Sequence, residues 1–316
     1  MSKILEKAFT NESWSKNSAD YERFAGAITT QWTNDALFLA HPKIVGIVSQ
    51  EKPTTFVDVG CGPGTLALAF AEKYLVESPA AAANINIIAT DLADGMLEIL
   101  EGKLNHSQRY MQFRENIKTI QMDGQLLDKL EDNSVDMIGS NFGMSIFPDR
   151  IKTWNSAARV LKDGGLLFAT AWDVKSTNMT WVDMFAKLAH EAQIAKDGES
   201  DTPLMLPSLK VGTTSDQVAT ELRAAGFTKV EMYRTQHSVV METPTRIVKS
   251  MLDNPASSGF VAIAGREVLE DVLYKSVLQQ AGFPNGIELP RNLDELRKVA
   301  YPVTLEFIGH VTVATK

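Results

Sequence analysis

The sequence has little of what places a protein in a membrane, in an oxidising compartment or on nucleic acid. Its single cysteine, Cys61, has no partner for an internal disulfide, so a reducing compartment is expected. No run of 18 apolar residues occurs, and charges are spread through the N-terminal segment, so we expect neither a membrane span nor a secretion signal. Acidic residues outnumber basic ones by 39 to 31, which disfavours nucleic acid as a partner. These absences predict a cytoplasmic protein without integral membrane association.

Short apolar runs alternate with helical patterns from about residue 54 onward. The runs predict buried strands, and the segments between them have the length and spacing of helices. Strands that alternate with helices imply a parallel sheet covered on both faces. The predicted strands are residues 54–60, 85–90, 117–123, 134–141 and 166–172, and the predicted helices are 64–78, 93–104 and 151–161.

The remainder of the chain is less regular. A capping-box spacing from Thr214 to Gln217 predicts a helix that ends near Gly226, and strands are predicted over 228–241 and 303–315. We divide the chain into four parts: an N-terminal helical lid over 1–50, a core over 51–175, a helical insertion over 176–212, and the end of the sheet over 213–316. This last part includes a helical cap over 243–300.

The stretch "VDVGCGPG", Val57 to Gly64, follows the first predicted strand. Glycines at a strand end permit positive φ and let a ligand approach the backbone, and the helix that follows offers free N–H groups. A nucleotide-type ligand is the natural inference. The dinucleotide pattern G-x-G-x-x-G is broken by Thr65, and no P-loop pattern is present, so a dinucleotide oxidoreductase is the weaker alternative.

Five motifs follow one another along the chain: "VDVGCGPG", "IIATDLADGML", "QMDG", "NSVDMIGSNFGMSIFPD" and "AARVLKDGGLLFATAWD". Together they resemble a class I S-adenosylmethionine-dependent methyltransferase of the ubiquinone/menaquinone C-methyltransferase-like small-molecule branch. The resemblance covers 54–173 well and leaves 243–300 unmatched. It implies an α/β fold with a Rossmann-like doubly wound sheet, mostly parallel with an antiparallel last strand, plus helical lid and cap insertions. It also implies S-adenosylmethionine as cofactor.

The same resemblance implies roles for individual residues. Gly60 and Gly62 would form the floor under the methionine part of the cofactor, and Asp58 would orient its ammonium group. Asp91 would accept hydrogen bonds from the ribose hydroxyls, and Asp123 would accept one from the adenine amino group. The residues that we predict to contact the cofactor are Tyr21, Asp58, Gly60, Cys61, Gly62, Asp91, Leu92, Met96, Met122, Asp123, Gly124, Asn141 and Phe142.

Several of these residues have a structural alternative. Asp91 or Asp123 taken alone could be a helix cap, although capping does not explain all five motifs together. Met96 and Met122 could be ordinary core residues rather than walls for the purine. Cys61 is most simply a small packed residue, because no histidine lies near it in sequence.

The two ends of the chain are expected to supply a lid and an acceptor site. Trp14 and Tyr21 precede the fold, and the resemblance implies that this segment folds over the cofactor, although both residues could equally be core. The insertions contain Trp181, Met184, Phe185 and Phe260, which suit a hydrophobic acceptor or an ordinary core. We therefore expect a small, largely apolar acceptor.

Methyl transfer from a sulfonium is an in-line displacement on an activated donor, so alignment and desolvation matter more than a strong base. Weak candidates for a base are Asp173, His237 and His310. The "NFGM" at 141–144 departs from the Asn-Pro-Pro-aromatic pattern of amide and amino-base methyltransferases. No Cys/His cluster has ligand spacing, so no metal is expected. A methyltransferase-fold protein without methylating activity is the other alternative.

Overall fold

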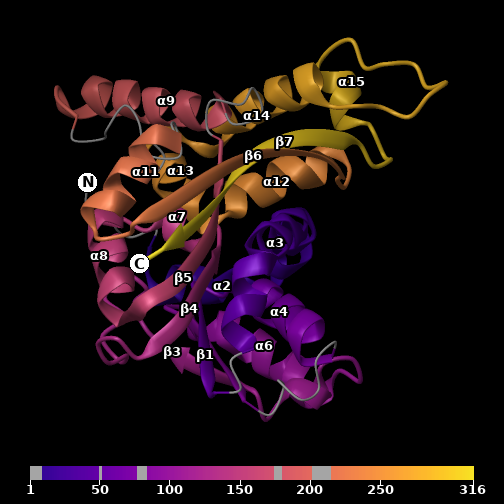
Figure 1. Ribbon diagram of the computed structural model, residues 1–316. Helices are drawn as coiled ribbons and strands as arrows, with labels where there is room; N and C mark the ends of the chain where they lie inside the picture. The colour runs from indigo at the N-terminus through magenta and orange to yellow at the C-terminus, as the bar shows by residue number, and fades with distance from the viewer. Residues whose placement is uncertain (1–8, 50–51, 77–83, 174–179, 201–214) are drawn as a thin grey trace.

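The computed structural model describes residues 9–49, 52–76, 84–173, 180–200 and 215–316. A seven-stranded sheet in the order β3-β2-β1-β4-β5-β7-β6 forms its centre (Figure 1). Strands β1 to β5 are parallel, and β7 runs antiparallel to both of its neighbours. The predicted fold class is confirmed. The strands are β1 Thr54–Val59, β2 Ile85–Asp91, β3 Ile117–Gln121, β4 Val135–Asn141, β5 Leu161–Trp172, β6 Lys229–Val240 and β7 Thr304–Thr315.

Helices cover both faces of this sheet (Figure 1). One face packs against α3 (Ser18–Val48), α4 (Thr65–Val76) and α6 (Asp94–His106), and the other against α7 (Gly143–Ile146), α8 (Arg150–Val160) and α11 (Ser215–Ala224). The side chains of successive strand residues point to opposite faces of the sheet. Phe56 therefore lies in the apolar core beneath α3, α4 and α6, and Val57 in the apolar core beneath α7, α8 and α11. Both faces of β1 are therefore buried, as its continuous apolar run predicts.

A third apolar cluster lies beside the end of the sheet. It contains side chains of α9 (Thr180–Asp197), α12 (Pro244–Asp253), α13 (Pro255–Ala264), α14 (Arg266–Gln280) and α15 (Leu293–Arg297), together with residues of β6 and β7. We call α12 to α15 the cap. Figure 1 shows α9 and α14 next to each other at the top of the view, above β6 and β7. The shorter elements are α2 (Asn11–Lys16) and the 3₁₀ turn η1 (Met111–Phe113).

The fifth strand begins earlier than the sequence indicates. It starts at Leu161, immediately after α8, where Leu161 pairs with Val135 of β4. The register then shifts, and Leu166 pairs with Met137, because Gly164 with φ of 77° turns the chain within the strand. The capping residue Thr214 and most of 200–212 lie outside the described residues. Among the described helices, none is both long and apolar enough to cross a membrane.

Candidate active site

The glycine loop folds over the ends of β1 and β2. Gly60 and Gly62 have φ of 65° and 53°, in the left-handed region that favours glycine. A Cβ at Gly60 would lie 3.1 Å from both the Gly143 Cα and the Phe147 ring. The Cys61 amide donates to the Thr90 carbonyl at 2.8 Å, which ties the loop to β2. The positive φ expected at this loop is confirmed, and it exposes backbone toward the strand ends.

Asp91, the last residue of β2, holds the loop in place. Its Oδ2 accepts a hydrogen bond from the Gly62 amide at 2.8 Å, and its Oδ1 accepts one from the Ala93 amide at 2.9 Å. Burial raises the pKa of this carboxyl above its usual value, and these backbone hydrogen bonds partly oppose the rise. A carboxylate oxygen accepts more than one hydrogen bond, so Asp91 can still accept from a ligand.

Asp58 is fully buried beside the same loop. Its Oδ2 accepts from the Ala67 amide of α4 at 2.9 Å, whereas its Oδ1 has no partner among the described residues. Burial raises its pKa to about 8, an effect opposed by the Ala67 hydrogen bond and reinforced by the charge of Asp91. Cys61 is also buried, and burial followed by the charge of Asp58 raises the pKa of its thiol. A thiol held protonated is a poor nucleophile, consistent with the packing interpretation of Cys61.

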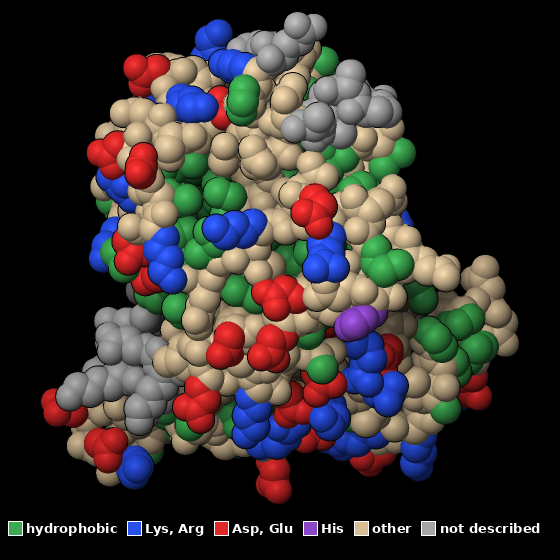
Figure 2. All heavy atoms as spheres, turned by 90° about the horizontal axis from the view of Figure 1, so that it is seen from below, with side chains coloured by type: hydrophobic (Ala, Val, Ile, Leu, Met, Phe, Trp, Pro, Cys, Tyr) green, Lys and Arg blue, Asp and Glu red, His purple; other side chains and the backbone are tan. Residues whose placement is uncertain are grey.

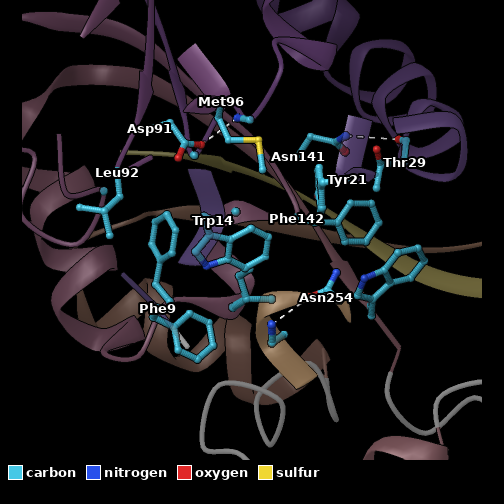
Figure 3. A pocket seen from close by; sticks show the side chains of 18 of the residues that line it. Phe9, Trp14, Tyr21, Thr29, Asp91, Leu92, Met96, Asn141, Phe142 and Asn254 are labelled. Carbon is cyan, nitrogen blue, oxygen red and sulfur yellow. Dashed lines mark hydrogen bonds between the residues drawn. The ribbon is translucent and has the colours of Figure 1, made fainter. Parts of the chain in front are cut away.

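A cavity of about 260 Å³ opens at this edge of the sheet. Figure 3 shows Asp91 and Met96 on one side, Asn254 on the other, and Trp14 and Phe142 between them. The residues from the strand ends, α6 and the segments after the strands are Gly60, Gly62, Asp91, Leu92, Met96, Met122, Asp123, Gly124, Gln125, Asn141, Phe142, Gly143, Ile146, Phe147 and Pro148. The N-terminal segment, the ends of β5 and β7, and the cap add Phe9, Trp14, Tyr21, Phe24, Ile28, Thr29, Trp172, Phe307, Met251, Asn254, Ala256, Ser257 and Phe260.

All but two of the predicted cofactor contacts line this cavity, and the two are Asp58 and Cys61. Met96 and Met122 are both buried and both line it, so each serves the core and the cavity. Asp123 Oδ1 accepts from the Gln125 amide at 2.8 Å, which fixes the carboxylate at the end of β3. The roles of these residues toward a ligand stay predictions, but the fold gathers them at one place.

Asn141 is the last residue of β4 and Phe142 follows it, and together they join three elements. The Asn141 amide nitrogen donates to the Thr29 carbonyl of α3 at 3.3 Å (Figure 3), and its oxygen accepts from the Thr170 hydroxyl of β5 at 2.9 Å. Phe142 has φ of 63°, a conformation that a non-glycine residue rarely adopts, and its amide donates to Thr170 Oγ1. Its ring stacks on Trp172 with the centroids 4.1 Å apart. This turn aims an aromatic side chain into the cavity.

The comparison with known proteins agrees with this arrangement. The model of the ubiE/COQ5 methyltransferase family matches residues 35–243. The chain belongs to this family. Over 188 residues it is 26% identical to the ubiquinone/menaquinone biosynthesis C-methyltransferase UbiE of Idiomarina loihiensis, a match that spans 58% of this chain and 70% of that protein. It is 23% identical to the methyltransferase ucsB of an Acremonium species over 215 residues, which are 62% of this chain and 66% of that protein.

A solved structure shows the same fold. The YcgJ protein of Bacillus subtilis aligns with a TM-score of 0.52 at 14% identity, covering 87% of this chain and 98% of that one. The protein is thus an S-adenosylmethionine-dependent methyltransferase, as the sequence motifs imply. The residues present fit that cofactor: the loop exposes glycine backbone, Asp91 and Asp123 offer acceptors at adjacent strand ends, and Met96 offers an apolar surface.

The N-terminal segment of this methyltransferase lies against α6. The Ser15 hydroxyl donates to Asp94 Oδ1 at 2.6 Å, and the amides of Asp94 and Gly95 donate to Asn11 Oδ1 and Ser15 Oγ, each at 3.0 Å. Residues of α2 therefore satisfy N–H groups at the start of α6, three residues after Asp91. We call this contact the α2 latch.

Trp14 and Tyr21 pack edge to face, with the ring centroids 5.6 Å apart, and both line the cavity. Burial, followed by the negative charges of Asp91 and Glu22, raises the pKa of Tyr21 to about 12. Tyr21 therefore keeps its proton at neutral pH.

The candidate bases lie elsewhere. None of Asp173, His237 and His310 is among the described residues that line the cavity of the methyltransferase. Asp173 Oδ2 accepts from Arg234 Nε at 2.9 Å, and His310 Nε2 lies 3.8 Å from the same oxygen. His237 Nε2 lies 2.7 Å from Asp35 Oδ2. Burial lowers the pKa of His310, so it is neutral at physiological pH.

The sequence missed Met251, Asn254, Ser257 and Phe307, which also line the cavity. The start of α13 has a recognisable signal, because Asn254 is followed by Pro255, a typical N-cap and first helical residue. Nothing in the sequence alone aims this helix start at the glycine loop. Trp181, one of the predicted acceptor residues, has a side chain outside the described set, whereas Phe185 is buried beneath α13 and Met184 is exposed.

Proposed function

We propose that this methyltransferase transfers a methyl group to a small, largely apolar acceptor held between the strand ends and the cap. The observation that supports this proposal is the cavity itself. It extends from the glycine loop and Asp91 at one side to Trp172, Phe260 and Phe307 at the other. Carboxylates and glycine backbone suit the polar cofactor, and an aromatic wall suits an apolar acceptor.

Methyl transfer requires little from the side chains of this protein except that they position the acceptor against the methyl donor. When bound, S-adenosylmethionine would supply a methyl group on a sulfonium, and the electrons of the carbon–sulfur bond would stay on sulfur as the methyl carbon forms its bond to the acceptor. The cavity walls align the acceptor for this in-line displacement and exclude water. Among the described lining residues, Asp91 and Asp123 are the only charged side chains, and both belong to the strand ends. The proton of the acceptor would therefore pass to solvent, because no other described lining residue has a charged side chain that could accept it.

The surface supports a small-molecule acceptor rather than nucleic acid. Figure 2 shows Lys and Arg side chains interleaved with Asp and Glu on the face that it presents. The formal net charge of −8 opposes the approach of a phosphate backbone.

Two measurements test the proposal together. Calorimetric titration of the full chain with S-adenosylmethionine, S-adenosylhomocysteine and NAD should show binding of the first two and none of the third. A methylation assay over a panel of neutral aromatic, amine, carboxylate and RNA acceptors should then give turnover with the neutral aromatic members. Absence of heat with both adenosyl compounds would contradict the whole proposal, and efficient methylation of RNA would contradict the acceptor class.

A further inference from the structure

Hydrogen bonds from two other elements hold the glycine loop in shape. Residues of β2 accept from the amides of Cys61 and Gly62, as described above. A further contact comes from α6, where Lys103 Nζ donates to the carbonyl oxygen of Pro63 at 2.8 Å. A glycine-rich backbone has many conformations available to it, so each such contact narrows the shape that the loop presents to a ligand.

Lys103 also binds the N-terminal end of α3. Its Nζ lies 2.6 Å from Oε1 of Glu22, and the side chains of Lys103 and Glu22 are 23% and 34% exposed. A lysine ammonium has three donor hydrogens, so it can bind Glu22 and the Pro63 carbonyl at the same time. Because most of the surface of this pair is shielded from water, its attraction is screened less than that of a fully exposed ion pair.

The residue before Glu22 lies directly against the loop. A Cβ on Gly62 would lie 3.9 Å from Cε1 of Tyr21, and both residues line the cavity. Two successive residues of α3 thus reach two successive residues of the loop. Tyr21 lies against Gly62, and Glu22 is joined to Pro63 through Lys103. Movement of this end of α3 away from the loop would break both connections together.

We propose that Lys103 is a positioning residue for the cofactor, which couples the closed position of α3 over the cavity to the shape of the glycine loop. The sequence motifs predict that Gly60 and Gly62 lie beneath the methionine part of S-adenosylmethionine. The coupling should therefore favour ligands that carry this part. Lys103 is not among the described residues that line the cavity, so it acts through the loop and α3. The inference rests on the cofactor half of the proposed function and adds a residue to it.

The test compares S-adenosylhomocysteine with 5′-methylthioadenosine, which has the same adenosine and sulfur but lacks the amino-acid part. Calorimetry on the full chain gives the Kd of the first ligand, and competition against it gives the Kd of the second. Lys103→Met keeps the length of the side chain but removes its charge. In this variant the preference for S-adenosylhomocysteine should fall by about 3- to 10-fold. Lys103→Arg keeps donors for both partners and should retain the wild-type preference.

Glu22→Gln tests the coupling with the lysine still in place. By itself it should lower the preference by about 2- to 3-fold, and in the Lys103→Met background it should lower it no further, because the two residues act through one ion pair. Lys118→Met, at an exposed position of β3, is the matched control and should leave the preference unchanged.

Thermal unfolding of each variant verifies that it is folded, and Glu22→Gln decides the test if Lys103→Met is not. An equal loss of affinity for both ligands would show a structural role only and would overturn the inference. An unchanged preference in the folded variants, or additive effects of the two substitutions, would overturn it as well. If S-adenosylhomocysteine does not bind the wild type, the proposed function fails instead.

Discussion

The two sides of the cavity are built in different ways. On the cofactor side, the glycine loop, Asp91 and Asp123 each follow a strand of the parallel sheet, and the sheet brings the three strand ends together. On the side that we propose for the acceptor, Trp172, Ser257 and Phe307 come from segments separated by 85 and 50 residues. The first side is set by local motifs on adjacent strands, and the second by the packing of the cap. We therefore propose that the geometry of the strand ends recognises the cofactor and that the cap which covers them selects the acceptor.

The largest effect, and the one that best distinguishes the two sides of the cavity, is expected for Asp91→Ala. The change removes a carboxylate that accepts from Gly62 and Ala93 and faces the cavity, so we expect S-adenosylmethionine affinity to fall by about 10- to 150-fold. Calorimetry measures the loss. Glu98→Ala, an exposed change on α6, is the control. Unchanged affinity in Asp91→Ala would show that this residue acts only as a structural cap.

Asp58, the buried acid of the cofactor side, should make the stability of the protein depend on pH. The raised pKa of Asp58 means that the folded protein holds a proton that the unfolded chain releases at lower pH. Its contribution to stability is therefore present at acid pH and is lost as the pH rises through about 8, by about 2 kcal/mol between pH 6 and pH 8.

Asp58→Asn keeps an acceptor for the Ala67 amide and removes the titration, so it should lose less stability over this range than wild type. Urea unfolding at pH 6 and pH 8 measures the difference between the two proteins. Asp91 remains in both and cancels in the comparison. Parallel pH profiles would contradict the assigned origin of the effect.

A smaller effect is expected at the α2 latch. A Cβ at Gly95 would lie 2.9 Å from the Cα, Cβ and carbonyl oxygen of Ser15, so Gly95→Ala should push α2 from α6. Losing the two or three hydrogen bonds of the latch should weaken cofactor binding by about 3- to 10-fold and speed hydrogen exchange over residues 11–17.

Gly102→Ala is the control on the same helix, because a Cβ there meets nothing within 4 Å. Faster exchange in Gly95→Ala without any change in cofactor affinity would argue against a lid role for α2. A deletion that tests the same lid role should remove no residue beyond 17, because α3 begins at Ser18 and its residue Ile28 is buried.

The smallest effects are expected at the three candidate bases. Asp173→Asn, His237→Gln and His310→Gln each alter a residue outside the described lining of the cavity, so kcat/KM for methylation should change by less than about 3-fold. The control is the stability of each variant, since Asp173 pairs with Arg234. A loss of about 10²- to 10⁴-fold at one position would identify a general base and contradict catalysis by positioning alone.

Local patterns predicted most of the sheet but not its irregularities. The apolar runs located the five parallel strands, and the antiparallel last strand followed from the family resemblance. The early start of β5 was missed because "KDGG" is typical of a helix stop and not of a strand that bends at Gly164. The hydrogen bonds of Asn141 with Thr29 and Thr170 were equally beyond a sequence pattern, because they join residues far apart in the chain.

The sequence by itself determined the cofactor side of this methyltransferase. Backbone freedom at Gly60 and Gly62, an acid at the end of β2 and another after β3 are local features, and a parallel sheet necessarily brings strand ends to one edge. Only the tertiary structure decided the acceptor side. The aim of α13 at the glycine loop depends on how α9, α12 and α14 pack around it, and that packing is a sum of non-local apolar contacts that no spacing in the sequence encodes.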